Sequence, residues 1–120
     1  MAHDEAYYEA EKKIGEVQRS GGVELDLDNL GLIELPESIR NLNNLRLLYI
    51  SNNQLSALPD WLCNFTQLEL LYISNNALTT LPSFLWQLRE LRSLNLSSNQ
   101  LSTLPEEIGR LTNLQELNLS

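Results

Sequence analysis

The sequence LRLLYISNNQLSALPDWLCNFTQ, residues 45–67, contains an apolar frame that recurs twice more without an insertion, and this recurrence predicts the architecture. Residues 68–90 and 91–113 repeat it at a period of 23, so each unit is numbered here from position 1 at its first leucine. The shared frame is L-x-x-L-x-[LI]-x-x-N-x-L-x-x-L-P-x-x-[LI]-x-x-[LF]-x-x. Self-similarity at such a period predicts stacked units that share one continuous core, rather than a globular fold.

The frame extends in weaker form on both sides of the three complete units. Residues 22–44 form a degenerate unit with Leu30 where the asparagine is expected, and residues 114–120 begin another that reaches its seventh position. Over residues 22–120 the chain resembles the leucine-rich repeat family. The resemblance implies an α/β fold, a right-handed solenoid in which about five short parallel strands, at positions 3 to 7 of each unit, line a concave face. Alternation of apolar residues within each unit is consistent with such strands.

One asparagine recurs at position 9, directly after each predicted strand, as Asn53, Asn76 and Asn99. A buried turn leaves backbone N–H and C=O groups that need partners, and an Asn amide donates and accepts at once. We therefore interpret these three residues as a structural asparagine ladder.

Residues 1–21 are predicted to form a separate N-terminal segment, a helix that caps the first unit. His3 or Asp4 is a suitable N-cap, and Gly21-Gly22 ends the helix near Arg19. One apolar face recurs at three- and four-residue steps, with Tyr7, Ala10, Ile14 and Val17. A helix that binds a membrane surface or a partner is the alternative, but its polar face carries more acid than base, which disfavours anionic lipid.

The C-terminal unit, residues 114–120, ends inside a predicted strand at Asn118-Leu119-Ser120. An unpaired last strand invites pairing with another edge. We expect that the chain is a fragment of a longer protein; a truncated gene and edge-to-edge self-association through this strand are the alternatives.

Charge and cysteine content restrict the partners. The net charge of the chain is −8. Residues 1–37 hold ten acids and three bases, so this segment carries a net charge of −7. Nucleic acid and anionic membranes are therefore disfavoured as partners. The single cysteine, Cys63, permits no intrachain disulfide, and the sequence shows neither a signal peptide nor an apolar run of membrane length. These features predict a cytoplasmic protein.

The sequence offers no catalytic constellation, so we expect no enzyme activity and no cofactor. The only histidine is His3, and the glycines lack the spacing of a phosphate-binding loop. Glu24, Asp26 and Asp28 alternate along one predicted strand. Such a row is a candidate for a divalent cation, but more often it is a solvated edge, and we predict no metal site.

The variable positions of the concave face carry the candidate site for a protein partner. In the two middle units Tyr49 and Tyr72 are predicted to be neighbours, with Leu47 and Leu70 beside them, as an exposed apolar patch. The predicted partner-binding residues are Arg46, Leu47, Tyr49, Glu69, Leu70, Tyr72, Arg92, Asn95 and Asn118. The alternative is that the stacked rings and leucines simply stabilise strand pairing.

Aromatic residues on the convex side form a second candidate. Trp61 and Phe84 share position 17, while Cys63 and Trp86 share position 19. Either one side chain of each pair packs under the return segment as additional core, which we favour, or the rings form a second site.

The N-terminal sequence EAEKKIGEVQRSGGVELDLDNLGLIELPESI, residues 9–39, looks like the start of the repeats in bacterial multidomain proteins, including the Roco family. In that family a GTPase module follows the repeats, and this chain carries no GTPase motif. Three hypotheses follow: a non-catalytic protein–protein interaction scaffold, the regulatory N-terminal segment of a Roco-like signalling protein, and a structural, self-associating solenoid.

Overall fold

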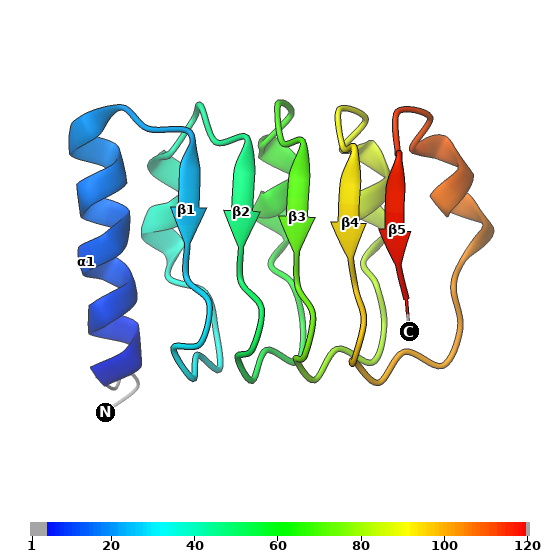
Figure 1. The fold of residues 1–120 in the computed structure, drawn as a ribbon, viewed down its shortest axis with the longest axis horizontal. Coiled ribbons are helices and arrows are strands. Elements are labelled where there is room, and N and C mark those ends of the chain that lie inside the picture. The colour runs from blue at the N-terminus through cyan, green and yellow to red at the C-terminus, as the bar shows by residue number, and fades with distance from the viewer. Residues whose placement is uncertain (1–4, 120) are drawn as a thin grey trace.

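A computed structural model describes residues 5–119 of the chain. The helix α1 (Glu5–Ser20) is followed by five parallel strands in one sheet of order β1-β2-β3-β4-β5, as Figure 1 shows. The strands are β1 (Glu24–Asp26), β2 (Leu47–Tyr49), β3 (Leu70–Tyr72), β4 (Ser93–Asn95) and β5 (Glu116–Asn118). Each return segment holds a short 3-10 helix: η1 (Glu37–Asn41), η2 (Asp60–Asn64), η3 (Ser83–Gln87) and η4 (Glu106–Arg110). The predicted solenoid with a helix at its N-terminal end is confirmed.

The strands are in register with the repeat, since each residue pairs with the one 23 further along, as Leu48 does with Leu71. They are shorter than predicted and cover positions 3 to 5 instead of 3 to 7. Bonds between coils nevertheless continue past the strand: Ile50 N–H donates to Tyr72 O, and Asn52 N–H to Ser74 O, both at 2.9 Å. At position 8 Asn52 takes a positive φ of 57°, which turns the chain away from the sheet.

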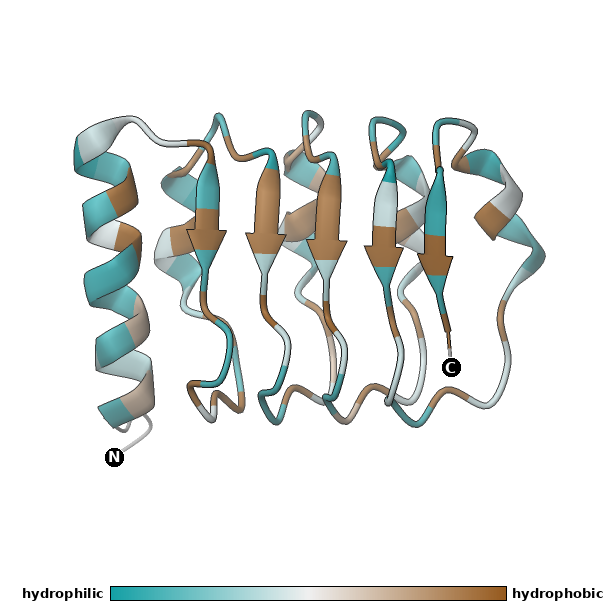
Figure 2. Cartoon of the chain, in the orientation of Figure 1, coloured by the Kyte–Doolittle hydropathy of each residue, from teal (hydrophilic) through white to brown (hydrophobic). Residues whose placement is uncertain are grey.

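The core is a stack of leucine layers between the sheet and the return segments. Positions 4 and 6 of the interior coils, such as Leu48 and Ile50, are fully buried. Figure 2 shows the apolar stripe crossing the strands from one coil to the next. Each 3-10 helix follows the frame proline, which lies in extended conformation, as Pro59 does at φ −71° and ψ 148°.

The helix α1 covers the first coil. Ala10 and Ile14 are buried in the common core, with Ala6 and Val17 packed partly against it. Gly21 has φ +69°, and the N–H groups of Gly21 and Gly22 donate to the carbonyls of Gln18 and Val17, which is the bonding of a Schellman motif. The predicted N-cap residues His3 and Asp4 lie outside the described residues. Within residues 5–119 no helix is long and apolar enough to span a bilayer.

Candidate interaction site on the concave face

The position-9 asparagines bond backbone groups of two successive coils. Asn76 Oδ1 accepts from Leu55 N–H at 3.0 Å, and Asn76 Nδ2 donates to the carbonyls of Ile50 and Ile73 at 3.0 and 3.2 Å. Asn53 and Asn99 make the equivalent bonds one coil earlier and one coil later. These side chains hold the turns that place the concave residues, and they face away from any partner on that surface.

A second polar column, at position 8, was not found from the sequence. Asn29, Asn52, Asn75 and Ser98 all adopt φ between 56° and 61°, a region that Asn tolerates better than most residues. Asn75 Nδ2 also donates to Asn52 Oδ1 at 2.6 Å. The recurring Asn-Asn pair, 52–53 and 75–76, is the signal that identifies this turn.

The side chains at position 7 were predicted to face the concave side, but they accept hydrogen bonds from the backbone of the next coil. Ser51 N–H donates to Asp28 Oδ1 at 2.7 Å, and Ser74 N–H donates to Ser51 Oγ at 3.0 Å. Burial raises the pKa of Asp28; its bond from Ser51 N–H opposes this shift, and the charge of Asp26 adds to it. Among residues 5–119 no three His, Cys, Asp or Glu side chains are grouped as metal ligands, and this includes Glu24 and Asp26 on β1 and Asp28 after it.

The centre of the concave face is an apolar cluster of Leu47, Tyr49, Leu70 and Tyr72 on β2 and β3. The rings of Tyr49 and Tyr72 meet edge to face, with centroids 5.5 Å apart and planes at 88°. All four side chains are half-buried rather than exposed, which corrects the prediction of an exposed patch. The reason is geometric: residues paired across neighbouring strands cover part of each other, as Leu47 and Leu70 do.

Polar groups border this cluster. Arg46 and Glu69, both predicted to bind the partner, form an ion pair across β2 and β3, with Nε 2.6 Å from Oε2. On the other side the Ser93 hydroxyl donates to Glu116 Oε1 at 3.0 Å and lies 3.4 Å from the Tyr72 hydroxyl.

The remaining predicted residues lie on the last two strands or beside them. Asn95 Oδ1 accepts from the backbone N–H and the hydroxyl of Ser97, at 3.0 and 2.8 Å. Arg92 and Asn118 are exposed. The structure thus brings the apolar four together with Arg46 and Glu69, while Asn118 lies two strands away on β5.

Burial raises the pKa of the Tyr49 hydroxyl, and the carboxylate of Glu24 adds to this shift, as do Tyr72, Asp26 and Asp28 more weakly. The Tyr49 hydroxyl therefore stays protonated across the physiological range, and its ring packs against that of Tyr72. It presents two hydroxyls on an apolar base, a combination suited to contacts with both apolar and polar groups of a protein.

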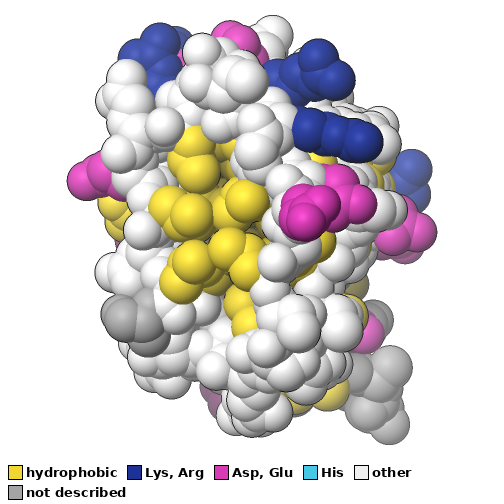
Figure 3. All heavy atoms as spheres, turned by 90° about the vertical axis from the view of Figure 1, so that its right-hand side faces the viewer, with side chains coloured by type: hydrophobic (Ala, Val, Ile, Leu, Met, Phe, Trp, Pro, Cys, Tyr) yellow, Lys and Arg dark blue, Asp and Glu magenta, His cyan; other side chains and the backbone are white. Residues whose placement is uncertain are grey.

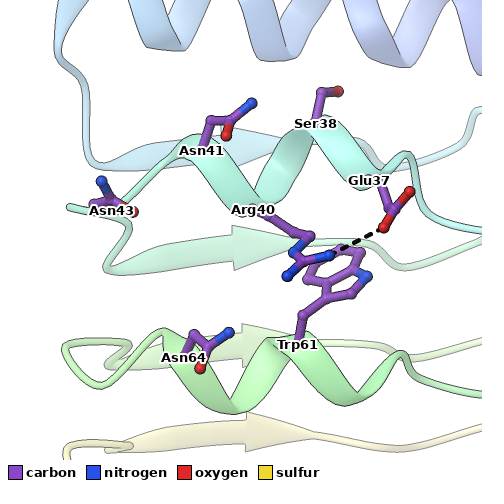
Figure 4. A pocket seen from close by; sticks show the side chains of 7 residues that line it. All are labelled: Glu37, Ser38, Arg40, Asn41, Asn43, Trp61 and Asn64. Atoms are coloured by element: carbon purple, nitrogen blue, oxygen red, sulfur yellow. Dashed lines mark hydrogen bonds and ion pairs between the residues drawn. The ribbon is translucent and has the colours of Figure 1, made fainter.

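The convex aromatic residues are divided between core and surface. Phe84 and Trp86 are buried, whereas Trp61 and Cys63 pack only partly against the core. Trp61 meets Phe65 edge to face and borders a shallow hollow, in which Arg40, held 3.0 Å from Glu37, lies towards the indole (Figure 4). One side chain of each pair is thus core, in line with the reading favoured from the sequence.

Comparisons with known proteins agree with this geometry. The profile described as "Leucine-rich repeat region" matches residues 24–120. Among solved structures, the chain is similar to a leucine-rich repeat protein of Leptospira interrogans, with 32% identity and a TM-score of 0.72 over 88% of this chain. The chain spans about a third of the length of that protein, since 33% of it is covered. A search of curated proteins finds no match.

Proposed function

The chain belongs to the leucine-rich repeat family, and on that premise we propose that it is a protein-interaction scaffold that holds its partner on the concave strand face. The family and the solenoid support an interaction domain in general. The finer assignment, to the concave face and to particular residues, is the proposal. We place the interaction in the cytoplasm, where a domain with the single cysteine Cys63 needs no disulfide.

The observation that carries the proposal is the apolar cluster on β2 and β3. Positions 3 and 5 are acidic on β1, with Glu24 and Asp26, and polar on β4, with Ser93 and Asn95. Among the five described strands, β2 and β3 alone combine leucine with tyrosine at these positions. A half-buried apolar centre inside a polar border is the arrangement of a small binding hot spot.

The charges around the cluster indicate the chemistry of the partner. Glu24 and Asp26 lie one strand before it, and Glu116 lies two strands after β3. Arg46 is neutralised by Glu69, so carboxylates dominate the border. The partner that fits is a protein segment with an apolar or aromatic side chain flanked by lysine or arginine.

The test is the double substitution Tyr49→Ala with Tyr72→Ala. A partner is first identified by quantitative pull-down from cells of the source organism, and its Kd is then titrated against both proteins. We expect binding to weaken at least tenfold, or about 1.4 kcal/mol, because the ring pair forms the centre of the site.

The matched control is Tyr8→Ala, which removes an exposed tyrosine from α1 and is expected to bind the partner normally. Circular dichroism and urea unfolding must show that both variants stay folded. An unchanged Kd for the folded double variant would reject the site and favour the reading in which the rings only stabilise strand pairing.

A second candidate function is that of a regulatory N-terminal segment in a Roco-like signalling protein. It is supported by the sequence of residues 9–39 and by the greater length of the solved relative. The coding sequence downstream of Ser120 tests it. Further units followed by a GTPase phosphate-binding loop would support this role, and a stop codon directly after Ser120 would exclude it.

A further inference from the structure

Charged side chains cross the concave face in an order that is not symmetric about the apolar cluster. Glu24 and Asp26 on β1 are both exposed. Arg46 and Glu69 follow at position 2 of the two middle coils, and Arg92 comes next, one residue before β4. Seen along the stack of strands, charged side chains lie at the margin of the coil and hydrophobic ones fill its middle (Figure 3). The order therefore runs from acidic to basic across the cluster.

Position 2 holds two bases and one acid in successive coils, so one base is left over. Glu69 stands between Arg46 and Arg92 in this column, 23 residues from each. Its carboxylate accepts from Arg46 Nε at 2.6 Å. Among residues 5–119 the guanidinium of Arg92 forms neither an ion pair nor a hydrogen bond, and its side chain is exposed. Arg92 is therefore an available cation on the β4 side of the cluster.

The opposite side of the cluster carries uncompensated acids. Within the described chain neither Glu24 nor Asp26 pairs with a lysine or an arginine. Asp26 Oδ1 accepts from Asp28 N–H at 3.0 Å, and this bond leaves the charge of the carboxylate in place. A segment that lies over the cluster thus meets two carboxylates at β1 and a guanidinium beside β4.

On the premise of the concave-face function, we propose that the occupant is an extended protein segment with a basic and an acidic residue on opposite sides of one apolar or aromatic residue. Its basic side chain lies over Glu24 and Asp26. Its apolar side chain rests on the rings of Tyr49 and Tyr72, and its acidic side chain pairs with Arg92. The segment therefore runs across the strands.

The spacing of the strands determines the spacing of these three side chains. Neighbouring strands lie about 4.8 Å apart, so β4 is about 14 Å from β1, and the middle of the cluster is about 7 Å from each. An extended chain rises about 3.3 Å per residue, so these distances take about four and about two residue steps. Residues two apart in an extended chain also face the same side. The basic, apolar and acidic residues at alternate positions therefore all reach the sheet.

The free guanidinium of Arg92 makes the site selective. A segment with basic residues on both sides of its apolar residue places one of them against Arg92, and like charges at an interface oppose binding. The preference for basic flanks is thus confined to the β1 side. The segment ends before β5, where Glu116 Oε1 already accepts from the Ser93 hydroxyl at 3.0 Å.

The first experiment selects random peptides displayed on phage against the immobilised chain. We expect enriched peptides to carry an apolar or aromatic residue with a basic residue two positions to one side and an acidic residue two positions to the other. Both chain directions satisfy this pattern. Basic residues on both sides, charges at the three- and four-residue spacing of a helix face, or no enriched pattern would overturn the proposal.

The same selection with the Tyr49→Ala, Tyr72→Ala variant separates this inference from the function on which it rests. We expect the variant to lose the peptides that the parent enriches. If enriched peptides depend on the rings but lack opposed charges, the concave site stands and the bipolar segment is rejected. If they bind without the rings, both proposals fall.

Charge reversal at Arg92 assigns the acidic end of the segment. The probes are a synthetic peptide with lysine, phenylalanine and glutamate at alternate positions between serines, and a second peptide in which lysine replaces the glutamate. For Arg92→Glu we expect the first peptide to bind at least tenfold more weakly and the second to bind better than the first. The matched control is Arg110→Glu, an equal charge change at an exposed position of η4. Equal effects of the two variants on calorimetric Kd values would overturn the pairing with Arg92.

The basic end is tested independently by Glu24→Lys, which keeps the bond between Asp26 and Asp28 N–H. We expect weaker binding of the first peptide and a preference for a third peptide, in which glutamate replaces the lysine. Glu107→Lys, at an exposed position of η4, is the control for net charge. An unchanged preference in Glu24→Lys, with folding verified by circular dichroism, would overturn the orientation of the segment.

Discussion

The same position of the repeat is buried at one end of the solenoid and exposed at the other. Leu25 on β1 and Leu117 on β5 both stand at position 4, yet Leu25 is fully buried and Leu117 is 40% exposed. The difference is the neighbour on the outer side: α1 lies against β1, whereas β5 is the last strand of the described sheet, next to β4 alone (Figure 1). The frame therefore decides which side chains point inward, and the adjacent coil or cap decides how much free energy their burial contributes.

The comparison also separates the ends by polarity. At the N-terminal end Ala10 and Ile14 complete the core, while the outer face of α1 is charged and exposed to solvent. At the C-terminal end the leucines themselves meet the solvent.

The largest expected effect comes from shortening the leucine at each end. Leu25→Ala leaves a cavity between α1 and the first coil, so we expect a loss of about 2–5 kcal/mol of unfolding free energy. Leu117→Ala removes a side chain that is already part-solvated, and we expect about 1 kcal/mol or less. Urea unfolding of both variants at low micromolar concentration measures the difference.

The comparison depends on the exposed fractions of the two side chains, which are 0% for Leu25 and 40% for Leu117. Equal losses for the two variants in the monomer would show that the last coil is as well covered in solution as the first.

The next effect in size concerns the asparagine ladder. Asn76→Leu keeps a similar volume but leaves Leu55 N–H and the carbonyls of Ile50 and Ile73 without their partner, so we expect a loss of about 2–4 kcal/mol. Asn99 makes the same bonds nearer the open end, where it is only half-buried. Water can replace part of them there, so Asn99→Leu should cost about half as much.

Thermal unfolding followed by circular dichroism measures both substitutions, with Asn64→Leu, at an exposed position of η2, as the control for added apolar surface. An unshifted melting temperature for Asn76→Leu would contradict the role of the ladder in holding the buried turns. Equal shifts for Asn76→Leu and Asn99→Leu would show that the open end does not admit water to the ladder.

The sequence predicted the solenoid because its apolar pattern is repeated. Each leucine of the frame has counterparts 23 residues away that support the same assignment. The helix α1 could equally be predicted from the sequence, since Ala10 and Ile14 fall on one apolar face and Gly21 marks the end of the helix. The strands were predicted to reach position 7 but end at position 5, and the bend with positive φ at position 8 was not predicted. That bend depends on a backbone conformation, which the apolar pattern does not encode.

The site was harder to predict than the fold, because pairs of side chains determine it. The sequence placed Tyr49 beside Tyr72, but it did not show that the two rings cover each other and leave a half-buried cluster. It also named Arg46 and Glu69 as separate contacts for a partner, although the two side chains form an ion pair with each other. Such contacts depend on the conformations of side chains on neighbouring strands. The sequence repeat shows only which positions pair with each other.

The smallest expected effect contrasts the acidic first coil with the serine that occupies the same position in later coils. Asp28 accepts from Ser51 N–H as the Ser51 hydroxyl accepts from Ser74 N–H, but only Asp28 must be desolvated as a charge. Because burial raises the pKa of Asp28 above 3.8, the folded state binds more protons than the unfolded state between 3.8 and the raised value. Stability therefore falls as the pH rises through this window, and the penalty is complete above it.

Asp28→Asn retains an oxygen for the Ser51 N–H and removes the charge, so the variant should be more stable than the parent at pH 7, by less than about 1 kcal/mol. At pH 3, where the parent carboxyl is protonated in both states, the advantage should vanish. Glu9→Gln, on the exposed face of α1, is the control for the general loss of negative charge. Equal gains for the two variants at pH 7 would assign the effect to net charge at the acidic end, whereas a gain confined to Asp28→Asn assigns it to burial of this carboxylate.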